Sequence, residues 1–139
     1  MLKVVRSEVI SLVKKVIATK NAPGGELAGL LSQGIQAGDF LFLCGQIGKD
    51  PKTGKMVEGI QEQTRQAIQN MKTILEAAGM SLKNVVKVVV FLNDLADYGE
   101  MNKAYMPFFR EDPPARSCVE TKLLKGLLVE LDATAYGKA

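Results

Sequence analysis

The chain has 139 residues, of which 47% are apolar and 24% charged, so its length and composition fit one globular domain with an ordinary core. It contains no histidine, which excludes serine–histidine and cysteine–histidine nucleophile systems and histidine-containing zinc sites. The net charge of +3 comes from residues 1–21, which carry five basic side chains and one acidic one, whereas residues 22–139 carry 13 basic and 14 acidic side chains. Such a nearly neutral domain lacks the concentrated basic face of nucleic-acid-binding proteins, so we do not expect a nucleic-acid partner.

The N-terminal segment, residues 1–16, is basic and partly apolar, and we interpret it as an extension before a domain of residues 17–139. No secretory signal is recognisable, so we expect a cytoplasmic protein, or a mitochondrial one if the extension is a transit peptide. No apolar run approaches the roughly 20 residues that cross a bilayer, so we expect no membrane partner. Cys44 and Cys118 are expected to be reduced thiols, and two cysteines cannot form a metal-binding cluster.

The first half of the domain is predicted to contain a loop at residues 21–25, a buried strand at residues 40–44 and a turn at residues 50–54. Residues 60–79 are predicted to form a long amphipathic helix, because apolar or small residues recur at helical spacing. Gly79 stands where a left-handed helix cap is expected. The stripe consists of Ile60, Thr64, Ala67, Ile68, Met71, Ile74, Leu75 and Ala78.

The second half begins with residues 85–92, which are rich in β-branched side chains and apolar on both faces apart from Lys87. This pattern is typical of a central strand. Residues 95–109 are predicted to form a second helix, and the sequence Asp-Pro-Pro at residues 112–114 ends it. Its apolar stripe consists of Leu95, Tyr98, Met101, Tyr105 and Phe108.

Two alternating strands are predicted at the end of the domain, at residues 115–121 and 127–136, and residues 122–126 are short enough to join them as a hairpin. The order of strands, helix, strand, helix and strands predicts an α+β domain, in which one mixed sheet carries both helices on one face. The other face needs cover that a chain of this length cannot supply, so we expect an oligomer.

A hairpin centred on Leu124 would pair Arg116 with Asp132 and Cys118 with Glu130, and would place these four side chains on one face of the sheet. By itself such a cluster is often only a solvated strand face with a weak ion pair. Cys118 is more often a small buried apolar residue than a nucleophile. Without histidine, its thiolate would need the charge of Arg116 for activation.

The sequence Pro-Ala-Arg-Ser-Cys-Val-Glu at residues 114–120 closely resembles a motif near the C-terminal end of the RidA/YjgF proteins, the reactive intermediate deaminases. Further segments resemble the family, in family order, over roughly residues 17–135. They lie at residues 17–23, 45–47, 50–54, 63–67, 76–79, 85–87, 94–95 and 108–109. So many segments in order make the resemblance specific.

The resemblance implies a fold like that of chorismate mutase and a homotrimer whose sheets form an inner barrel, with clefts between subunits. It also implies hydrolysis of 2-aminoacrylate-type enamines and imines to 2-keto acids and ammonia. Such intermediates arise from pyridoxal-phosphate enzymes that act on serine or threonine. The small-molecule partner would thus be an enamine, an imine or a 2-keto acid, and the family's reaction needs no cofactor and no metal.

The resemblance also assigns roles to single residues. Arg116 matches the arginine that binds the substrate carboxylate, a role that suits a planar guanidinium. Glu130 matches the acid that positions the attacking water, a general-base role. Asn102 and Cys118 match residues that line the cleft, and we expect Cys118 to shape the site rather than to attack.

Two departures from the family pattern affect this cleft. Leu31 stands where the family commonly has a tyrosine that closes the cleft, and Cys44 stands where it commonly has a serine. Leu124 also replaces the usual proline of a Leu-Pro-Lys sequence. The loss of two hydroxyl groups removes hydrogen-bond partners for substrate or water. Because Leu31 is smaller and more apolar than a tyrosine, we expect a more open and less polar cleft, in which larger or more apolar substrates lose less activity relative to the serine-derived one.

Two alternative functions belong to other classes. The family often carries the label of a ribonuclease that inhibits translation, but the nearly neutral domain and the absence of histidine argue against RNA cleavage. A non-catalytic, trimeric ligand-binding protein would agree with the two lost hydroxyl groups. Product release from 2-aminoacrylate generated in situ distinguishes this alternative from the deaminase.

Overall fold

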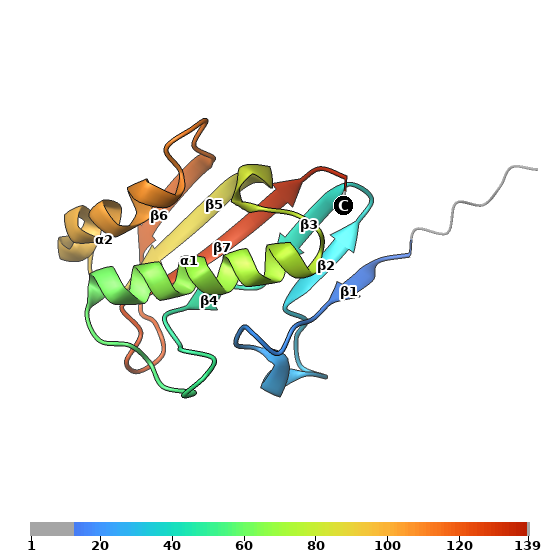
Figure 1. Ribbon diagram of the computed structural model, residues 1–139. Coiled ribbons are helices and arrows are strands. Elements are labelled where there is room, and N and C mark those ends of the chain that lie inside the picture. Colours follow the sequence, from blue (N-terminus) through green and yellow to red (C-terminus); the bar gives the residue numbers. More distant parts are fainter. Residues whose placement is uncertain (1–12, 139) are drawn as a thin grey trace, which may run out of the picture.

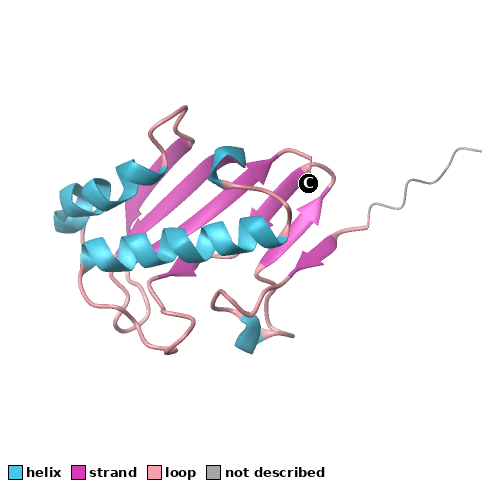
Figure 2. Ribbon diagram, in the orientation of Figure 1, coloured by secondary structure: helices cyan, strands magenta, loops and turns pink. Residues whose placement is uncertain are grey.

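The computed structural model describes residues 13–138. Helix α1 (Ile60–Ala77) and helix α2 (Tyr98–Tyr105) lie on the same face of a single sheet, as Figure 1 and Figure 2 show. The strands are β1 (Lys15–Ile17), β2 (Gly34–Ala37), β3 (Phe40–Leu43), β4 (Gln46–Ile47), β5 (Val85–Leu92), β6 (Ala115–Glu120) and β7 (Val129–Tyr136). Their order is β1-β2-β3-β7-β5-β6, and β4 also pairs with β7. Because β5 and β6 are parallel and the other pairs antiparallel, the predicted α+β fold with a mixed sheet is confirmed.

Helix α1 confirms the first predicted helix. Its stripe packs on the sheet and is inaccessible to solvent at Ala67, Ile68, Met71, Ile74 and Leu75. Gly79 follows the helix with a φ of 74°, and the N–H of Met80 donates to the carbonyl of Leu75 at 2.9 Å. The predicted left-handed cap is therefore present, at a position where glycine avoids the steric cost of a Cβ.

The second predicted helix, over residues 95–109, is present but is not one α-helix. It consists of the 3-10 turn η3 (Leu95–Asp97), helix α2 and the 3-10 turn η4 (Met106–Phe108). The carboxylate of Asp94 caps its start by accepting the N–H of Ala96 at 2.8 Å. Regular α-helical bonding stops near Pro107, which has no N–H to donate to the carbonyl four residues earlier.

Strand β5 is central, as predicted, and this position overturns the predicted hairpin. β5 pairs with β7 in antiparallel and with β6 in parallel orientation, so it lies between the two strands that were expected to pair with each other. A parallel pair needs a crossover connection, and α2 supplies it between β5 and β6. Residues 122–126 instead pass the end of β5, where Asn93 accepts the N–H of Leu123 through its side chain at 3.3 Å and donates its own N–H to Leu128.

The prediction that four polar side chains share one face is therefore also wrong. Cys118 packs against the core beneath the helices, and Arg116, two residues earlier on β6, shares this face. Glu130 and Asp132 alternate along β7 with core residues such as Leu131, so they point to the opposite face. The paired positions are Arg116 with Val88 and Glu130 with Phe91, not Arg116 with Asp132.

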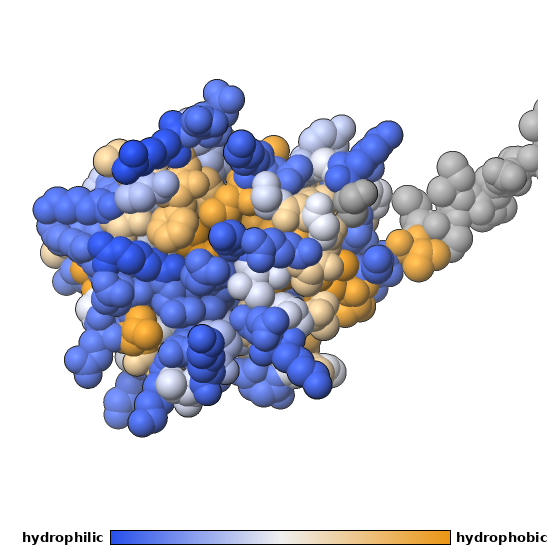
Figure 3. All heavy atoms as spheres, viewed as in Figure 1, coloured by the Kyte–Doolittle hydropathy of each residue, from blue (hydrophilic) through white to orange (hydrophobic). Residues whose placement is uncertain are grey.

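The face of the sheet opposite the helices carries exposed aromatic rings. Phe40, Phe42 and Tyr136 are 43%, 47% and 51% exposed, and the Phe40 ring lies 5.1 Å from Tyr136 and 6.1 Å from Phe42 between centroids. Strand β3 was predicted to be buried, but only its inward residues Leu41 and Leu43 are, because α1 covers one side of the sheet alone. In contrast, hydrophilic side chains form the outer surface of α1 (Figure 3).

The predicted boundary between the N-terminal extension and the domain, between residues 16 and 17, falls within strand β1. The sheet begins with β1 at Lys15, Val16 pairs with Ile35, and Ile17 belongs to the core. Residues 1–12 of the expected extension lie outside the described residues.

The predicted turn at residues 50–54 is present, with the N–H of Gly54 donating to the carbonyl of Asp50 at 2.8 Å. Within residues 13–138, no helix combines the length and the apolar character needed to span a membrane.

Candidate active site

The first candidate region is a pocket of about 840 Å³ between α2, the segment after it and the start of β6. Arg116 and Asn102, both predicted as site residues, line this pocket together. Its lining contains three basic residues and no acidic residue. One of the three, Lys103, already donates a hydrogen bond to the carboxylate of Glu100 at 2.5 Å. The remaining walls are largely apolar, so the pocket favours a small anionic ligand with an apolar part.

Two tyrosine rings hold the Arg116 side chain. Its guanidinium carbon lies 4.8 Å from the ring centroid of Tyr105 and 5.7 Å from that of Tyr98, and its Nη2 donates to the Tyr98 hydroxyl at 3.3 Å. Among residues 13–138, no carboxylate lies within ion-pair distance of Arg116. The guanidinium therefore keeps its full charge and most of its N–H donors for a ligand.

Asn102 and Cys118 complete this group. Asn102 lines the pocket, and its Oδ1 atom is buried and makes no hydrogen bond within the described part of the chain. Cys118 is half-buried on the strand of Arg116, and burial raises the pKa of its thiol although the charge of Arg116 opposes this. A protonated thiol is a poor nucleophile, which agrees with a shaping role.

Leu31 and Cys44 meet in a second pocket, of about 310 Å³, whose further walls include Leu27, Gly45 and Ile47. Burial raises the pKa of the Cys44 thiol, and the negative charges of Asp132 and Glu130 raise it further. The Cys44 sulfur accepts a hydrogen bond from Gln46 Nε2 at 3.2 Å. The two substituted positions thus form one largely apolar hollow beside the carboxylates of β7.

Glu130 lies directly against Gly45. A Cβ on residue 45 would come within 2.9 Å of Cδ and 3.1 Å of Cγ of Glu130, and closer still to its Oε1. Only glycine leaves room for the carboxyl group in this position. Partial burial raises the pKa of Glu130, and the neighbouring Asp132 adds to the effect. A carboxylate with a raised pKa is a better proton acceptor near neutral pH.

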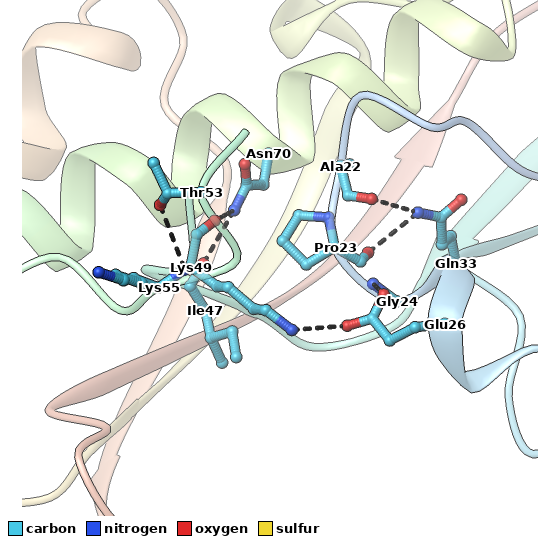
Figure 4. A network of polar contacts seen from close by, with 10 residues as sticks. All are labelled: Ala22, Pro23, Gly24, Glu26, Gln33, Ile47, Lys49, Thr53, Lys55 and Asn70. Carbon is cyan, nitrogen blue, oxygen red and sulfur yellow. Dashed lines mark hydrogen bonds and ion pairs between the residues drawn. The ribbon is translucent and has the colours of Figure 1, made fainter. Parts of the chain in front are cut away.

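A polar network fixes the loop that carries Leu31 (Figure 4). The buried side chain of Gln33 donates to the carbonyls of Ala22 and Pro23 at 2.8 and 2.9 Å. Glu26 accepts a hydrogen bond from Lys49 Nζ at 2.8 Å, so the loop is also tied to the segment after β4. These contacts hold one wall of the Leu31 pocket in place.

The predicted site residues therefore form two groups within one chain. Arg116, Asn102 and Cys118 lie on the helix face near the β6 edge, whereas Glu130 lies on the opposite face next to the pocket of Leu31 and Cys44. The two pockets share no lining residue. Over residues 13–138, no group of three acidic or cysteine side chains could hold a metal ion.

The residues that sequence reasoning missed are Tyr98 and Tyr105 as partners of Arg116. Both were assigned to the apolar stripe of the second helix. Their spacing of seven residues, two helical turns, places them on one side of the helix, and this was the signal that could have indicated a shared partner. Gly45 was likewise recognised only as part of a family segment, and its contact with Glu130 could not be seen in the sequence.

Comparisons with known proteins find similarity over most of the chain. Residues 19–137 match the family described as Endoribonuclease L-PSP. A RutC family protein of Pyrococcus horikoshii is 52% identical over 126 residues, which are 89% of this chain and 98% of the relative. A protein of Salmonella typhimurium named 2-iminobutanoate/2-iminopropanoate deaminase is 42% identical over 127 residues, covering 88% of this chain and 98% of the relative.

Solved structures agree in fold. The crystal structure of E. coli TdcF with bound serine superposes with a TM-score of 0.83 at 37% sequence identity, and the match covers 89% of this chain and 99% of that one. The similarity in sequence and fold thus extends over nearly the whole described chain.

Proposed function

The chain belongs to the endoribonuclease L-PSP family, also called RidA/YjgF, and we propose that it is a deaminase that hydrolyses 2-aminoacrylate-type enamines and imines to 2-keto acids and ammonia. The similarity to the Salmonella deaminase supports this reaction. The observation that carries the proposal is the guanidinium of Arg116, which lines a pocket without an acidic partner among the described residues. A charged, unpaired arginine in a concave site needs an anion, and a substrate carboxylate supplies one.

Arg116 would bind the carboxylate through two N–H groups and hold the C=N carbon in a fixed position. Protonation of the enamine carbon by solvent gives the iminium ion, and water then adds to its carbon. Glu130 would orient this water, accept one of its protons and pass that proton to the nitrogen. The C–N bond then breaks and ammonia leaves, while the remaining hydroxyl proton returns to solvent and the C–O bond becomes the keto group. No electron transfer is involved, so water is the only co-reactant.

We further propose a homotrimer, because the group of Arg116 and the group of Glu130 are separated within one chain. Within one chain Arg116 and Glu130 lie on opposite faces of the sheet, so a complete site needs Glu130 of another copy. The exposed rings of Phe40, Phe42 and Tyr136 support this, since their face of the sheet is large and uncovered. Sedimentation should show a stable trimer at micromolar concentration, and a monomer would contradict the proposal.

The direct test measures turnover. A pyridoxal-phosphate dehydratase generates 2-aminoacrylate from serine, and pyruvate and ammonia are followed with and without the protein. We expect faster product release, which Arg116→Ala abolishes. Release at the uncatalysed rate would favour the non-catalytic ligand-binding alternative. Salt-sensitive binding and cleavage of RNA would instead favour the ribonuclease alternative.

A further inference from the structure

The partners of Arg116 are unusual for a half-buried arginine. Such a side chain is commonly paired with a carboxylate, which satisfies its N–H groups and cancels its charge. Here two aromatic rings take that place, with Tyr105 at 4.8 Å and Tyr98 at 5.7 Å from the guanidinium carbon. The role inferred for these rings rests on the proposed function, in which Arg116 binds the substrate carboxylate.

We propose that Tyr98 and Tyr105 are positioning residues that form an aromatic bracket around Arg116. The face of an aromatic ring attracts a cation, and the guanidinium carbon of Arg116 lies over both rings. A ring does not occupy the N–H donors as a carboxylate would, so they stay free apart from the one N–H that the Tyr98 hydroxyl accepts. The bracket thereby fixes the side chain, keeps its positive charge and leaves the edge free for a bidentate contact with a carboxylate.

The two rings differ in how firmly they are held. Tyr105 is 5% exposed, and the ring of Phe109 lies 4.7 Å away between centroids, so Tyr105 is a fixed support. Tyr98 is 44% exposed at the start of α2, and its hydroxyl accepts one N–H of Arg116 at 3.3 Å. We therefore assign the larger share of the positioning to Tyr105 and the smaller share to Tyr98.

The Tyr105 hydroxyl supports a role of the ring rather than of the oxygen. It is buried and makes no hydrogen bond within the described chain. Burial raises the pKa of Tyr105 to about 12, although the charge of Arg116 opposes this, so the phenol stays neutral at physiological pH. A neutral ring cannot neutralise Arg116 as a phenolate would, and removal of its oxygen costs no hydrogen bond.

The test compares substitutions that keep the ring with substitutions that remove it. Calorimetric binding of 2-oxobutanoate is measured for Tyr105→Phe and Tyr105→Leu, and likewise for Tyr98→Phe and Tyr98→Leu. From the energy of cation–π contacts, we expect Tyr105→Leu to weaken binding about tenfold and Tyr98→Leu about threefold. Tyr105→Phe should stay within about twofold of wild type, because it keeps the ring and removes no hydrogen bond. Tyr98→Phe keeps the ring but loses the hydrogen bond from Arg116, so its affinity should lie between that of wild type and that of Tyr98→Leu.

Turnover provides a second readout that a merely structural role would not change in the same way. Loss of carboxylate positioning weakens ground-state and transition-state binding alike, so the leucine variants should raise KM and leave kcat nearly unchanged. Tyr105→Leu removes a core ring, so its thermal midpoint is measured as well. If it does not fold, the exposed Tyr98 pair decides the question by the same comparison.

The proposed bracket would be overturned if, at the same tyrosine position, the leucine variant and the phenylalanine variant bound 2-oxobutanoate with equal affinity. This holds whether both variants keep the wild-type affinity or both lose it. Arg116→Ala separates this outcome from a failure of the proposed function. If Arg116→Ala loses 2-oxobutanoate binding while the ring makes no difference, the carboxylate site stands and the bracket is wrong. If Arg116→Ala binds like wild type, the proposed site itself is wrong.

Discussion

Gly45→Ala offers a sharp test of the position of Glu130, because it adds a single methyl group at a known place. The new Cβ would lie 2.9 Å from Cδ and 3.1 Å from Cγ of Glu130. Oε1 of Glu130 would lie closer still to the new Cβ, and ordinary contacts between heavy atoms need about 3.5 Å, so the carboxyl group must move by about 1 Å. The backbone of Gly45 does not need a positive φ, so alanine brings no conformational strain.

A displacement of about 1 Å in a catalytic group can lower the rate about 100-fold, and we expect a loss of this order in the turnover of 2-aminoacrylate. The fold should survive, because the displaced atoms are the end of a flexible side chain. Binding of 2-oxobutanoate should change little, because Arg116 and not Glu130 makes the proposed contact with the ligand carboxylate. Gly99→Ala is the matched control, since a Cβ there meets no atom within 4 Å. Wild-type turnover of Gly45→Ala, with a normal fold, would refute the role given to Glu130.

Further predictions concern the other site residues. Arg116→Ala should lose 2-keto acid binding by about 1.5–3 kcal/mol per hydrogen bond to the carboxylate, and Arg116→Lys should fail nearly as badly because lysine lacks the planar fork; calorimetry with pyruvate checks both, and unchanged affinity would contradict the assignment. Glu130→Gln should keep binding but lower kcat by about 10²–10⁴-fold, as steady-state kinetics would show. Because the pKa of Glu130 is raised in the folded state, its carboxyl group keeps a proton at pH values above the ordinary pKa of 4.5. The stability of the wild type therefore falls as the pH rises from the ordinary pKa through the raised one. Glu130→Gln should show a smaller fall in chemical denaturation across the same pH range, and an identical pH dependence would speak against the raised pKa. Leu31→Tyr combined with Cys44→Ser should shift the ratio of kcat/KM values toward the serine-derived substrate and away from larger apolar ones, and an unchanged ratio would show that both departures are neutral.

The spacing and type of neighbouring residues correctly predicted the helix, cap and strand that depend on local sequence. The stripe of α1 and its cap at Gly79 follow from helical spacing and from the conformational freedom of glycine, and both are present. The apolar character of β5 on both faces correctly indicated a central strand. The short strands β1, β2 and β4 were missed, because segments of two to four residues carry too little periodicity to be recognised.

Strand pairing was the main failure, and it explains the error in the site. A short connection between two alternating strands favours a hairpin, but β5 occupies the edge of β7 on which the hairpin partner would lie. Long-range pairing of this kind depends on the whole sheet and leaves no local signal. As a result, Arg116 and Glu130 were predicted on one face and lie on two. The proximity of Leu31 to Cys44 had been expected only through the resemblance, and the structure places both in one pocket.

The most direct test of the central claim is a crystal structure of the protein with 2-oxobutanoate. We expect a homotrimer in which the ligand carboxylate makes two contacts with the Arg116 guanidinium, while Glu130 of a neighbouring copy faces the keto carbon within reach of one water molecule. A ligand bound away from Arg116 would contradict the proposed site. An assembly that leaves Glu130 remote from every Arg116 would contradict the proposed mechanism.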